Sequence, residues 1–343
     1  MSIEQPVTLS GSPGSPYTRK MLAVLRYRRI AYRFIAGSRG LQGLPQPKVR
    51  LLPTFYLPDE AGELQAVTDS SPLIRRFETA FAPRKVIPDH PALAFLDSLI
   101  EDYGDEWMTK QMFHYRWHFQ DDIDKSASVL PNWMGEPLAD EALASLGKMF
   151  SERQIGRLRF VGSNEMTWET IEASYRRGID ILNRHFSAHR FLLGDRPGAG
   201  DFGVFGQLTQ LAVFDPTPMA LATRTAPRVV AWTGFVEDLS GLEPEASDWF
   251  DPSALPATLI ELLAEIGRVY APLLIANAKA VMAGAAEVSA TVDGRPWTQQ
   301  PFPYQAKCLN WLRNDYQALD ASHRALVDKA LAGTGCEAMF GAL

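Results

Sequence analysis

The sequence predicts a small α/β domain followed by a larger domain of helices. Its length of 343 residues suits two domains. The first 85 residues alternate short β-prone runs with two helical patterns, whereas helical periodicity dominates from Pro91 onward. Residues 1–85 also hold 13 basic and 6 acidic residues, while the remainder holds 21 basic and 34 acidic residues. We therefore expect domains at residues 1–85 and 90–343, with a boundary near Pro83 to Pro91.

The composition excludes several classes of protein. Hydrophobic residues make up 46% of the chain and charged residues 22%, which is ordinary for a globular protein. Two cysteines without a C-x-x-C motif exclude a disulfide framework and a zinc ribbon. The N-terminal residues have no features of a secretory signal, and the longest apolar run, residues 271–284, is too short and too polar to span a bilayer. We expect a cytoplasmic protein that does not bind a membrane.

The basic character of the first domain has two interpretations. It suits a small anionic ligand, or it is a solvated basic face that balances an acidic neighbour. The basic residues are scattered and lack interleaved aromatic residues, so we do not expect nucleic acid as a partner.

The elements of the first domain follow from local signals. The β-prone runs are residues 7–9, 32–35, 52–57 and 64–67. Pro16 begins a helical pattern with apolar residues on one face, and Asp69-Ser70-Ser71-Pro72 is a typical start of a second helix. Pro53 at the start of a strand is either an ordinary trans proline or the site of a cis bond.

Three short segments resemble a known family. Ser15-Pro16-Tyr17-Thr18 is similar to the C-P-Y-C site of glutaredoxins with both cysteines replaced. The order of SPGSPYTRKM, Leu52-Pro53 and Asp69-Ser70-Ser71-Pro72-Leu73 resembles the N-terminal domain of cytosolic glutathione S-transferases, whose E-S-x-A-I motif is matched by D-S-S-P-L. The resemblance implies a thioredoxin-like domain, a cis bond at Pro53 and glutathione as ligand. With serine and threonine replacing cysteine, dithiol chemistry is not expected at this site.

A second match to this family lies downstream, in residues 191–205. There the family has a capping box, in which an N-cap Ser or Thr is followed three residues later by Asp. Here Gly198 replaces the N-cap residue, whereas Asp201 is present.

The resemblance implies Ser15 as the residue that stabilises the glutathione thiolate. It would act at the start of a helix, by hydrogen bonding and with the help of the helix dipole. Ser12 and Tyr17 are the alternatives, since related families use a donor at this position or nearby. A plain N-cap is the structural alternative for Ser15.

The resemblance also implies a binding site for the rest of glutathione. Asp69 and Ser70 would hold the γ-glutamyl end, and Leu52 before a cis Pro53 would pair with the cysteinyl backbone. Helix capping is the structural alternative for Asp69 and Ser70. The candidates for the glycyl carboxylate are Arg19, Arg39, Lys48 and Arg50.

The helical part contributes a candidate pocket for the second substrate. In the resembled fold its first helix lines that pocket, so the wall candidates are Tyr103, Trp107, Phe113 and Trp117, with ordinary helix packing as the alternative. His114 and His118 are four residues apart, but no H-E-x-x-H motif is present, and we expect no metal. Asp293-Gly294 between β-prone residues predicts a hairpin.

Together these features predict a glutathione-dependent transferase that attacks a small, apolar or aromatic electrophile. Lyase, dehalogenase and isomerase variants of this chemistry stay open, and the resemblance implies a homodimer. The alternative is a non-catalytic binding or interaction protein that kept the fold. It is motivated by Gly198 in the capping box, by the changed E-S-x-A-I motif and by the long unmatched extension from about residue 245. For residues 120–165 the motifs place no counterpart in the family.

Overall fold

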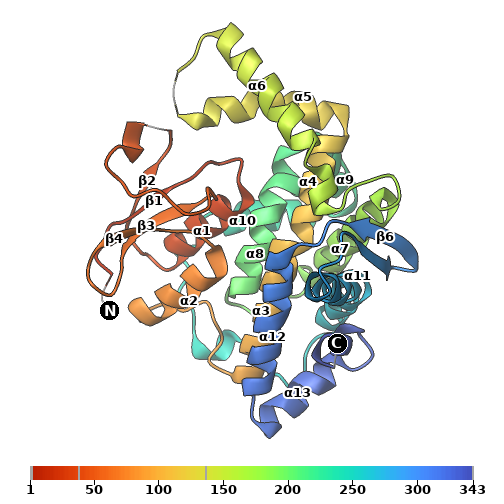
Figure 1. Cartoon of the computed structure of the whole chain (residues 1–343). Helices are drawn as coiled ribbons and strands as arrows, with labels where there is room; N and C mark the ends of the chain where they lie inside the picture. Colours follow the sequence, from red (N-terminus) through yellow and green to blue (C-terminus); the bar gives the residue numbers. More distant parts are fainter. Residues whose placement is uncertain (1–2, 38, 136, 342–343) are drawn as a thin grey trace.

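A computed structural model describes residues 3–37, 39–135 and 137–341 of the chain. Figure 1 shows the sheet domain on the left and the helical domain on the right, with α1 and α2 between the sheet and the helices. The predicted order of a small α/β domain and a larger helical domain is confirmed.

The N-terminal domain forms one four-stranded sheet. Its elements are β1 (Val7–Ser10), α1 (Pro16–Tyr27), β2 (Tyr32–Ile35), η1 (Arg39–Leu41), β3 (Thr54–Pro58), β4 (Leu64–Val67) and α2 (Ser70–Ala80). The strand order is β2-β1-β3-β4, with β1 and β2 parallel and the other pairs antiparallel. The strand predicted from residue 52 begins at Thr54, because Pro53 has no N–H group to offer the ladder. The Leu52–Pro53 bond is cis, as the resemblance implied.

The second domain consists of helices with one β-hairpin. Its first helices are α3 (Pro91–Glu106), α4 (Met108–His118), α5 (Gln120–Val129), η2 (Leu130–Met134), α6 (Asp140–Ile155), η3 (Leu158–Val161) and α7 (Trp168–His185). Next come α8 (Ala199–Leu208), η4 (Thr209–Phe214), α9 (Pro216–Thr225), α10 (Pro227–Val236) and η5 (Ala246–Asp248). The extension holds α11 (Ala257–Met282), β5 (Val288–Val292), β6 (Arg295–Gln299), α12 (Pro303–Ala318), α13 (Ala321–Leu331) and η6 (Cys336–Phe340). The hairpin turns at Asp293-Gly294, where both φ angles are positive, as the predicted turn requires.

Helix α8 is the buried centre around which the two domains join. It packs against α3 and against α1. Both contacts are close because glycines lie between the backbones: a Cβ atom on Gly104 would lie 2.8 Å from the carbonyl carbon of Gly203, and one on Gly206 would lie 2.6 Å from the carbonyl oxygen of Pro16. The first turn of α1 is therefore fixed directly against the core of the helical domain.

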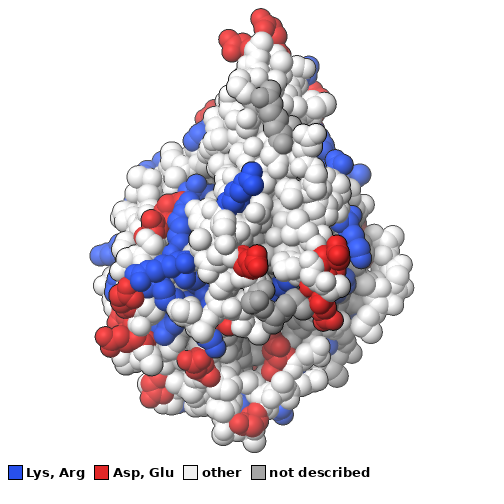
Figure 2. Space-filling model, turned by 90° about the vertical axis from the view of Figure 1, so that its left-hand side faces the viewer, with Lys and Arg blue, Asp and Glu red and all other residues white. Residues whose placement is uncertain are grey.

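Ion pairs between the domains join basic residues of the first domain to acidic residues of the second. Arg19 and Arg26 of α1 both pair with Glu237, at 2.5 and 2.7 Å, and Arg29 and Arg84 both pair with Glu243. Figure 2, which faces the N-terminal domain, shows Lys and Arg side chains beside Asp and Glu side chains on this surface. The basic first domain thus has an acidic neighbour, as one of the two interpretations proposed.

The segments that the sequence motifs did not place, residues 120–165 and the extension from about residue 245, occupy two places. Figure 1 shows α5 and α6 projecting from one end of the molecule, and α12 lying over α3 on the side of the N-terminal domain. Helix α12 packs against both α3 and α11. Among the helices that the structure describes, none is long and apolar enough to cross a membrane.

Candidate functional site

A cavity of about 1000 Å³ lies between the two domains. The N-terminal domain contributes the loop before α1, the segment around Pro53 and the start of α2. The helical domain contributes α3 and α4, the segment from η2 to η3, and helix α12 of the extension. The sequence-predicted residues that line this cavity are Ser12, Ser15, Tyr17, Arg50, Leu52, Pro53, Asp69, Ser70, Phe113 and Trp117.

Ser15 is the N-cap of α1 and also faces the cavity. Its Oγ accepts a hydrogen bond from the backbone N–H of Thr18 at 3.3 Å, which is the cap contact, and donates to the carbonyl oxygen of Leu52 at 3.4 Å. Both bonds are long, so the hydroxyl group is weakly held and can reorient toward a ligand. The cap and a second role as a donor therefore coexist in one side chain.

The two alternatives to Ser15 differ in how they are held. The hydroxyl of Tyr17 donates to the main-chain oxygen of Asp105 at 2.7 Å, and burial beside Glu106 and Asp105 raises the pKa of Tyr17 well above its usual range. The one proton of the Tyr17 hydroxyl group is therefore already engaged in a hydrogen bond to the main chain. Ser12 Oγ accepts from the backbone N–H of Gly14 at 3.4 Å, which leaves its own proton free of that bond.

The backbone of Asp69 has an unusual conformation. Its φ angle is +83°, which is sparsely populated for any residue except glycine and costs roughly 1–3 kcal/mol. The Asp69 side chain makes no cap hydrogen bond to α2, although the residue is the N-cap. Its carboxylate instead accepts a hydrogen bond from the hydroxyl of Tyr304 in α12 at 2.8 Å. The capping alternative for Asp69 thus does not describe its side chain.

Ser70 lies above a buried ion cluster that the sequence did not indicate. Lys20 is fully buried, and its Nζ donates to Glu101 at 2.7 Å, to Asp105 at 2.6 Å and to Ser70 Oγ at 3.1 Å. Burial raises the pKa of Asp105 to about 6 against the opposing effect of Lys20, whereas the charge of Lys20 holds the pKa of Glu101 below its usual range despite burial. The cluster joins α1, α2 and α3 beneath the cavity. In the sequence Lys20 directly follows Thr18 and Arg19, and nothing there indicated that it is buried.

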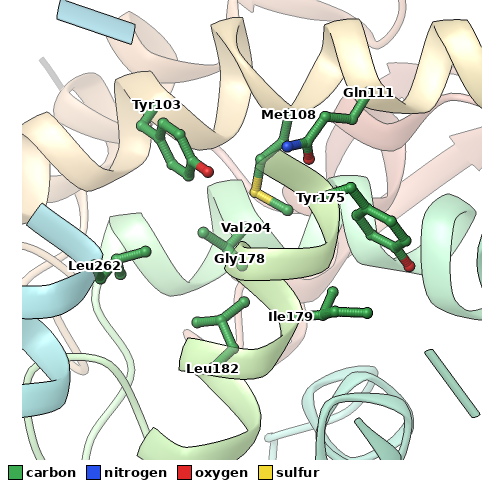
Figure 3. A pocket seen from close by; sticks show the side chains of 9 residues that line it. All are labelled: Tyr103, Met108, Gln111, Tyr175, Gly178, Ile179, Leu182, Val204 and Leu262. Carbon is green, nitrogen blue, oxygen red and sulfur yellow. The ribbon is translucent and has the colours of Figure 1, made fainter. Parts of the chain in front are cut away.

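Two of the four aromatic candidates line the large cavity, and the other two do not. Phe113 and Trp117 of α4 line the large cavity, and Phe150 of α6 packs against Trp117 with ring centroids 5.8 Å apart. Trp107 lies in the core, where its indole N–H donates to Ser174. Tyr103 lines a separate cavity of only about 10 Å³ among α3, α4, α7, α8 and α11, shown in Figure 3, which has room for no substrate.

The basic candidates for binding the glycyl carboxylate differ in whether they line the cavity. Arg50 lines the cavity, whereas Arg19 is paired with Glu237 and Lys48 is exposed outside the lining. The side chain of Arg39 lies outside the described residues.

Two segments that the sequence motifs did not place build walls of the cavity. Helix α12 contributes Tyr304, Gln305, Cys308 and Trp311, while the segment from η2 to η3 contributes Leu130, Leu146, Phe150 and Phe160, among others. Cys308 is buried, and burial beside Asp102 raises the pKa of its thiol far above the usual range, so it is a poor nucleophile.

The histidine pair of α4 has protein partners. His114 Nδ1 lies 2.8 Å from Ser163 Oγ, and the rings of His114 and His118 stack with centroids 4.9 Å apart. Across residues 3–37, 39–135 and 137–341, no three His, Cys, Asp or Glu side chains are grouped in a way that could hold a metal ion.

Two family models match the chain. The model of the glutathione S-transferase N-terminal domain matches residues 9–85, and that of the glutathione S-transferase C-terminal domain matches residues 139–234. Together these matches cover just over half of the chain. They include Ser15, Pro53 and Asp69, but neither α3 nor the extension that carries α12. The expectation that residues 120–165 have no counterpart in the family is wrong for residues 139–165, because the second match begins at residue 139. No curated protein matches the sequence.

Solved structures of similar proteins are distant. A GST-like protein from Pseudomonas syringae is 16% identical, with 75% of this chain and 78% of that chain covered and a TM-score of 0.41. A glutathione transferase family member from Pseudomonas fluorescens, solved with two glutathione bound, is 14% identical, with coverage of 67% and 87% and a TM-score of 0.36. Maleylacetoacetate isomerase from Anaeromyxobacter dehalogenans is 16% identical, with coverage of 71% and 96% and a TM-score of 0.39. At these TM-scores, the family assignment depends on the two domain matches.

Proposed function

Since the chain belongs to the glutathione S-transferase family, we propose that it is a transferase that binds glutathione in the cavity between its domains. It activates the glutathione thiol for attack on a small electrophile that has an apolar or aromatic part. The observation that carries this proposal is the hydroxyl of Ser15, which lies at the N-terminus of α1 and in the wall of the cavity.

A free thiol of this kind has a pKa near 8.5, so only a small share is thiolate at neutral pH. Ser15 lowers the thiol pKa by donating a hydrogen bond to the thiolate, in place of its long bond to Leu52. The N-terminus of α1, a helix of 12 residues, adds favourable electrostatics for negative charge. Tyr17 is a weaker candidate for this role because its proton is held by the Asp105 carbonyl.

The peptide part of glutathione is bound by main-chain and charged groups around the thiol. Leu52 is 45% exposed at the cavity edge, where its main-chain atoms pair with the cysteinyl backbone in the manner of an added strand. The Asp69 carboxylate attracts the γ-glutamyl ammonium, and the N-terminus of α2 at Ser70 attracts the α-carboxylate. Arg50 is the basic candidate that lines the cavity, and it is our choice for the glycyl carboxylate.

The second substrate binds on the side of α4 and α6. Phe113, Trp117 and Phe150 form an apolar wall there, which favours an aromatic or aliphatic body. The volume of about 1000 Å³ is at the upper end of the range for ligand pockets, so two substrates fit together.

Calorimetric titration with glutathione in two buffers of different ionisation enthalpy tests the proposal. We expect binding with release of a proton, since the site favours the thiolate. S-methylglutathione is the matched control, because it has the same peptide contacts but no ionisable thiol, and it should bind without proton release. Absence of glutathione binding would overturn the proposed function. So would a number of released protons that is the same for glutathione and S-methylglutathione.

A further inference from the structure

A polar seam runs between α3 and α12 along one side of the cavity. The two helices are antiparallel, because the Gln305 amide donates to the main-chain oxygen of Glu106 at 3.3 Å, while the rings of Tyr316 and Phe95 lie 5.8 Å apart. The seam lies outside both matched domains. Its members that line the cavity are Asp102, Glu106, Tyr304, Gln305, Cys308 and Trp311.

Asp102 and Glu106 stand one helical turn apart in this seam without a cation to balance them. The Asp102 carboxyl group accepts a 2.6 Å hydrogen bond from the hydroxyl of Tyr270, which is a neutral partner, and Glu106 is only 8% exposed. Among the described residues, neither carboxyl group forms an ion pair. Lys110, one turn further on, donates its hydrogen bonds to η3 and β6 instead.

A paired carboxyl group on the same helix shows the difference that a cation makes. Burial acts on Glu101 as well, but the charge of Lys20, at 2.7 Å, holds its pKa below the usual range. Burial without such a partner raises the pKa of Asp102 to about 7 and that of Glu106 to about 8. A positive charge placed beside these two groups would return them to their ionised form. The other titratable groups that face Glu106 are Tyr17, Asp105, Lys110, Tyr270, Tyr304 and Cys308.

Gln305 adds a buried acceptor that has no donor. Its side chain lines the cavity and is 1% exposed, and its Oε1 has no hydrogen-bond partner among the described residues. Buried polar atoms are normally paired, so an orphan acceptor at a cavity wall favours a ligand that brings a donor. A primary ammonium group carries three donors and no acceptor, which matches a seam of two carboxyl groups and one amide oxygen.

Aromatic rings continue the seam toward the mouth of the cavity. Tyr304 lies with its ring centroid 6.2 Å from that of Phe302 and 6.0 Å from that of Trp311. Phe302 and Trp311 are each 43% exposed, and all three rings line the cavity. Aromatic faces attract a nearby cation and also pack against an apolar body. Rings beside unpaired carboxyl groups therefore suit a positive charge that is carried on an apolar molecule.

We propose that this seam is a second binding site of the cavity, and that its ligand is a primary amine with an aromatic body. The ammonium group donates to the carboxyl groups of Asp102 and Glu106 and to Gln305 Oε1. The aromatic body lies against Tyr304 and Trp311. The contacts proposed for glutathione include none of the three acceptors, so the amine and glutathione occupy the cavity together.

The first test uses the native chain and three probes of nearly the same shape. At neutral pH 2-phenylethylamine is positive, 2-phenylethanol is neutral and phenylacetate is negative. Calorimetric titration should show that the amine binds about 10- to 100-fold more tightly than the alcohol, because its hydrogen bonds are to charged groups. Phenylacetate should bind most weakly of the three. Equal affinities for the amine and the alcohol would overturn the proposal.

The second test removes one charge from the seam and keeps its shape. Glu106→Gln should weaken binding of the amine by about 10-fold and leave binding of the alcohol unchanged. The ratio of the two dissociation constants is the readout, since a general loss of folding weakens both ligands. Glu152→Gln, on the exposed side of α6 and outside the cavity lining, is the matched control and should keep the native ratio. An unchanged ratio in Glu106→Gln would contradict the assignment.

The third test separates the seam from the site proposed for the γ-glutamyl ammonium at Asp69. The amine titration is repeated in the presence of saturating glutathione, and the dissociation constant should stay within about twofold of its value without glutathione. Displacement of the amine by glutathione would mean that the two ammonium groups compete at Asp69, and the second site would be overturned. Absence of glutathione binding overturns the proposed function alone, because the first two tests need no glutathione.

Discussion

The carboxylate of Asp97 takes the place that an N-cap side chain would occupy at Gly198. It accepts hydrogen bonds from the backbone N–H groups of Ala199 and Gly200 at 3.1 and 2.9 Å, while Asp201 accepts from the N–H of Gly198 at 2.9 Å. A Cβ atom on Gly198 would lie 2.2 Å from Asp97 Oδ1. The departure from the capping box of the family is therefore compensated by a side chain from α3, which also fixes α3 against α8.

This arrangement predicts that restoring the family's residue is harmful. Gly198→Ser should lower the free energy of unfolding by about 1–3 kcal/mol, because the new side chain collides with Asp97 in a packed core. Urea denaturation measures the change. In the background of Asp97→Ala the same substitution should cost less, since the serine then caps α8 itself. Equal costs in the two backgrounds would show that Asp97 and Gly198 are independent.

Ser15→Ala separates a cap from a catalytic donor. Loss of the cap contact to Thr18 should reduce stability by about 0.5–2 kcal/mol. Loss of the thiolate donor should lower kcat/KM by about 10²–10³-fold and abolish proton release on binding of glutathione. Steady-state kinetics and two-buffer calorimetry measure these effects. Ser12→Ala, which removes another hydroxyl from the same wall, is the control; a large loss there with little in Ser15→Ala would move the role to Ser12.

Tyr304 should contribute to the binding of glutathione although it lies in the extension. Its hydroxyl orients the Asp69 carboxylate, so Tyr304→Phe should weaken the affinity for glutathione by about 2- to 10-fold. Tyr316→Phe is a matched control, because Tyr316 lies in the same helix and donates to Asp328 at 2.6 Å on the exposed side. Calorimetry compares the dissociation constants. If both variants bind glutathione equally well, the contact between Tyr304 and Asp69 has no part in binding.

The elements of the N-terminal domain could be predicted because their signals are local. Proline at the first turn of α1, the turn residues before β4 and the acceptors before α2 each act within a few residues. The candidate residues around Ser15 and Asp69 come from the same local motifs. Family resemblance, and not periodicity, supplied the cis bond at Pro53.

The rest of the candidate site depends on contacts between distant segments. Tyr304 reaches Asp69 across 235 positions, and Lys20 reaches Asp105 across 85 positions. Tyr103 and Phe113 both have the apolar character of a pocket wall, and only packing decides that Phe113 faces the large cavity. Residues 139–234 match the family, but the walls from α3 and α12 do not, so no motif indicated Tyr304.

Asp102 gives the stability of the protein an unusual dependence on pH. Burial raises the pKa of its carboxyl group to about 7, whereas an unfolded aspartate titrates near pH 3.9. Between these values the folded state binds more protons than the unfolded state, so the contribution of Asp102 to stability decreases as pH rises. The free energy of unfolding of the native chain, relative to Asp102→Asn, should therefore fall by up to about 1.4 kcal/mol per pH unit in this interval.

Asp238→Asn is the control for this comparison, because the pKa of Asp238 is shifted in the opposite direction. Hydrogen bonds from the hydroxyl group and the backbone N–H of Ser240 lower the pKa of this exposed carboxyl group. Asp238 is thus ionised in both states above about pH 5, and the difference between the native chain and Asp238→Asn should stay constant from there to pH 8. Urea denaturation at several pH values measures both differences. A constant difference for Asp102→Asn as well would mean that the Asp102 carboxyl group is ionised in the folded protein, with Tyr270 and its other neighbours offsetting the cost of burial.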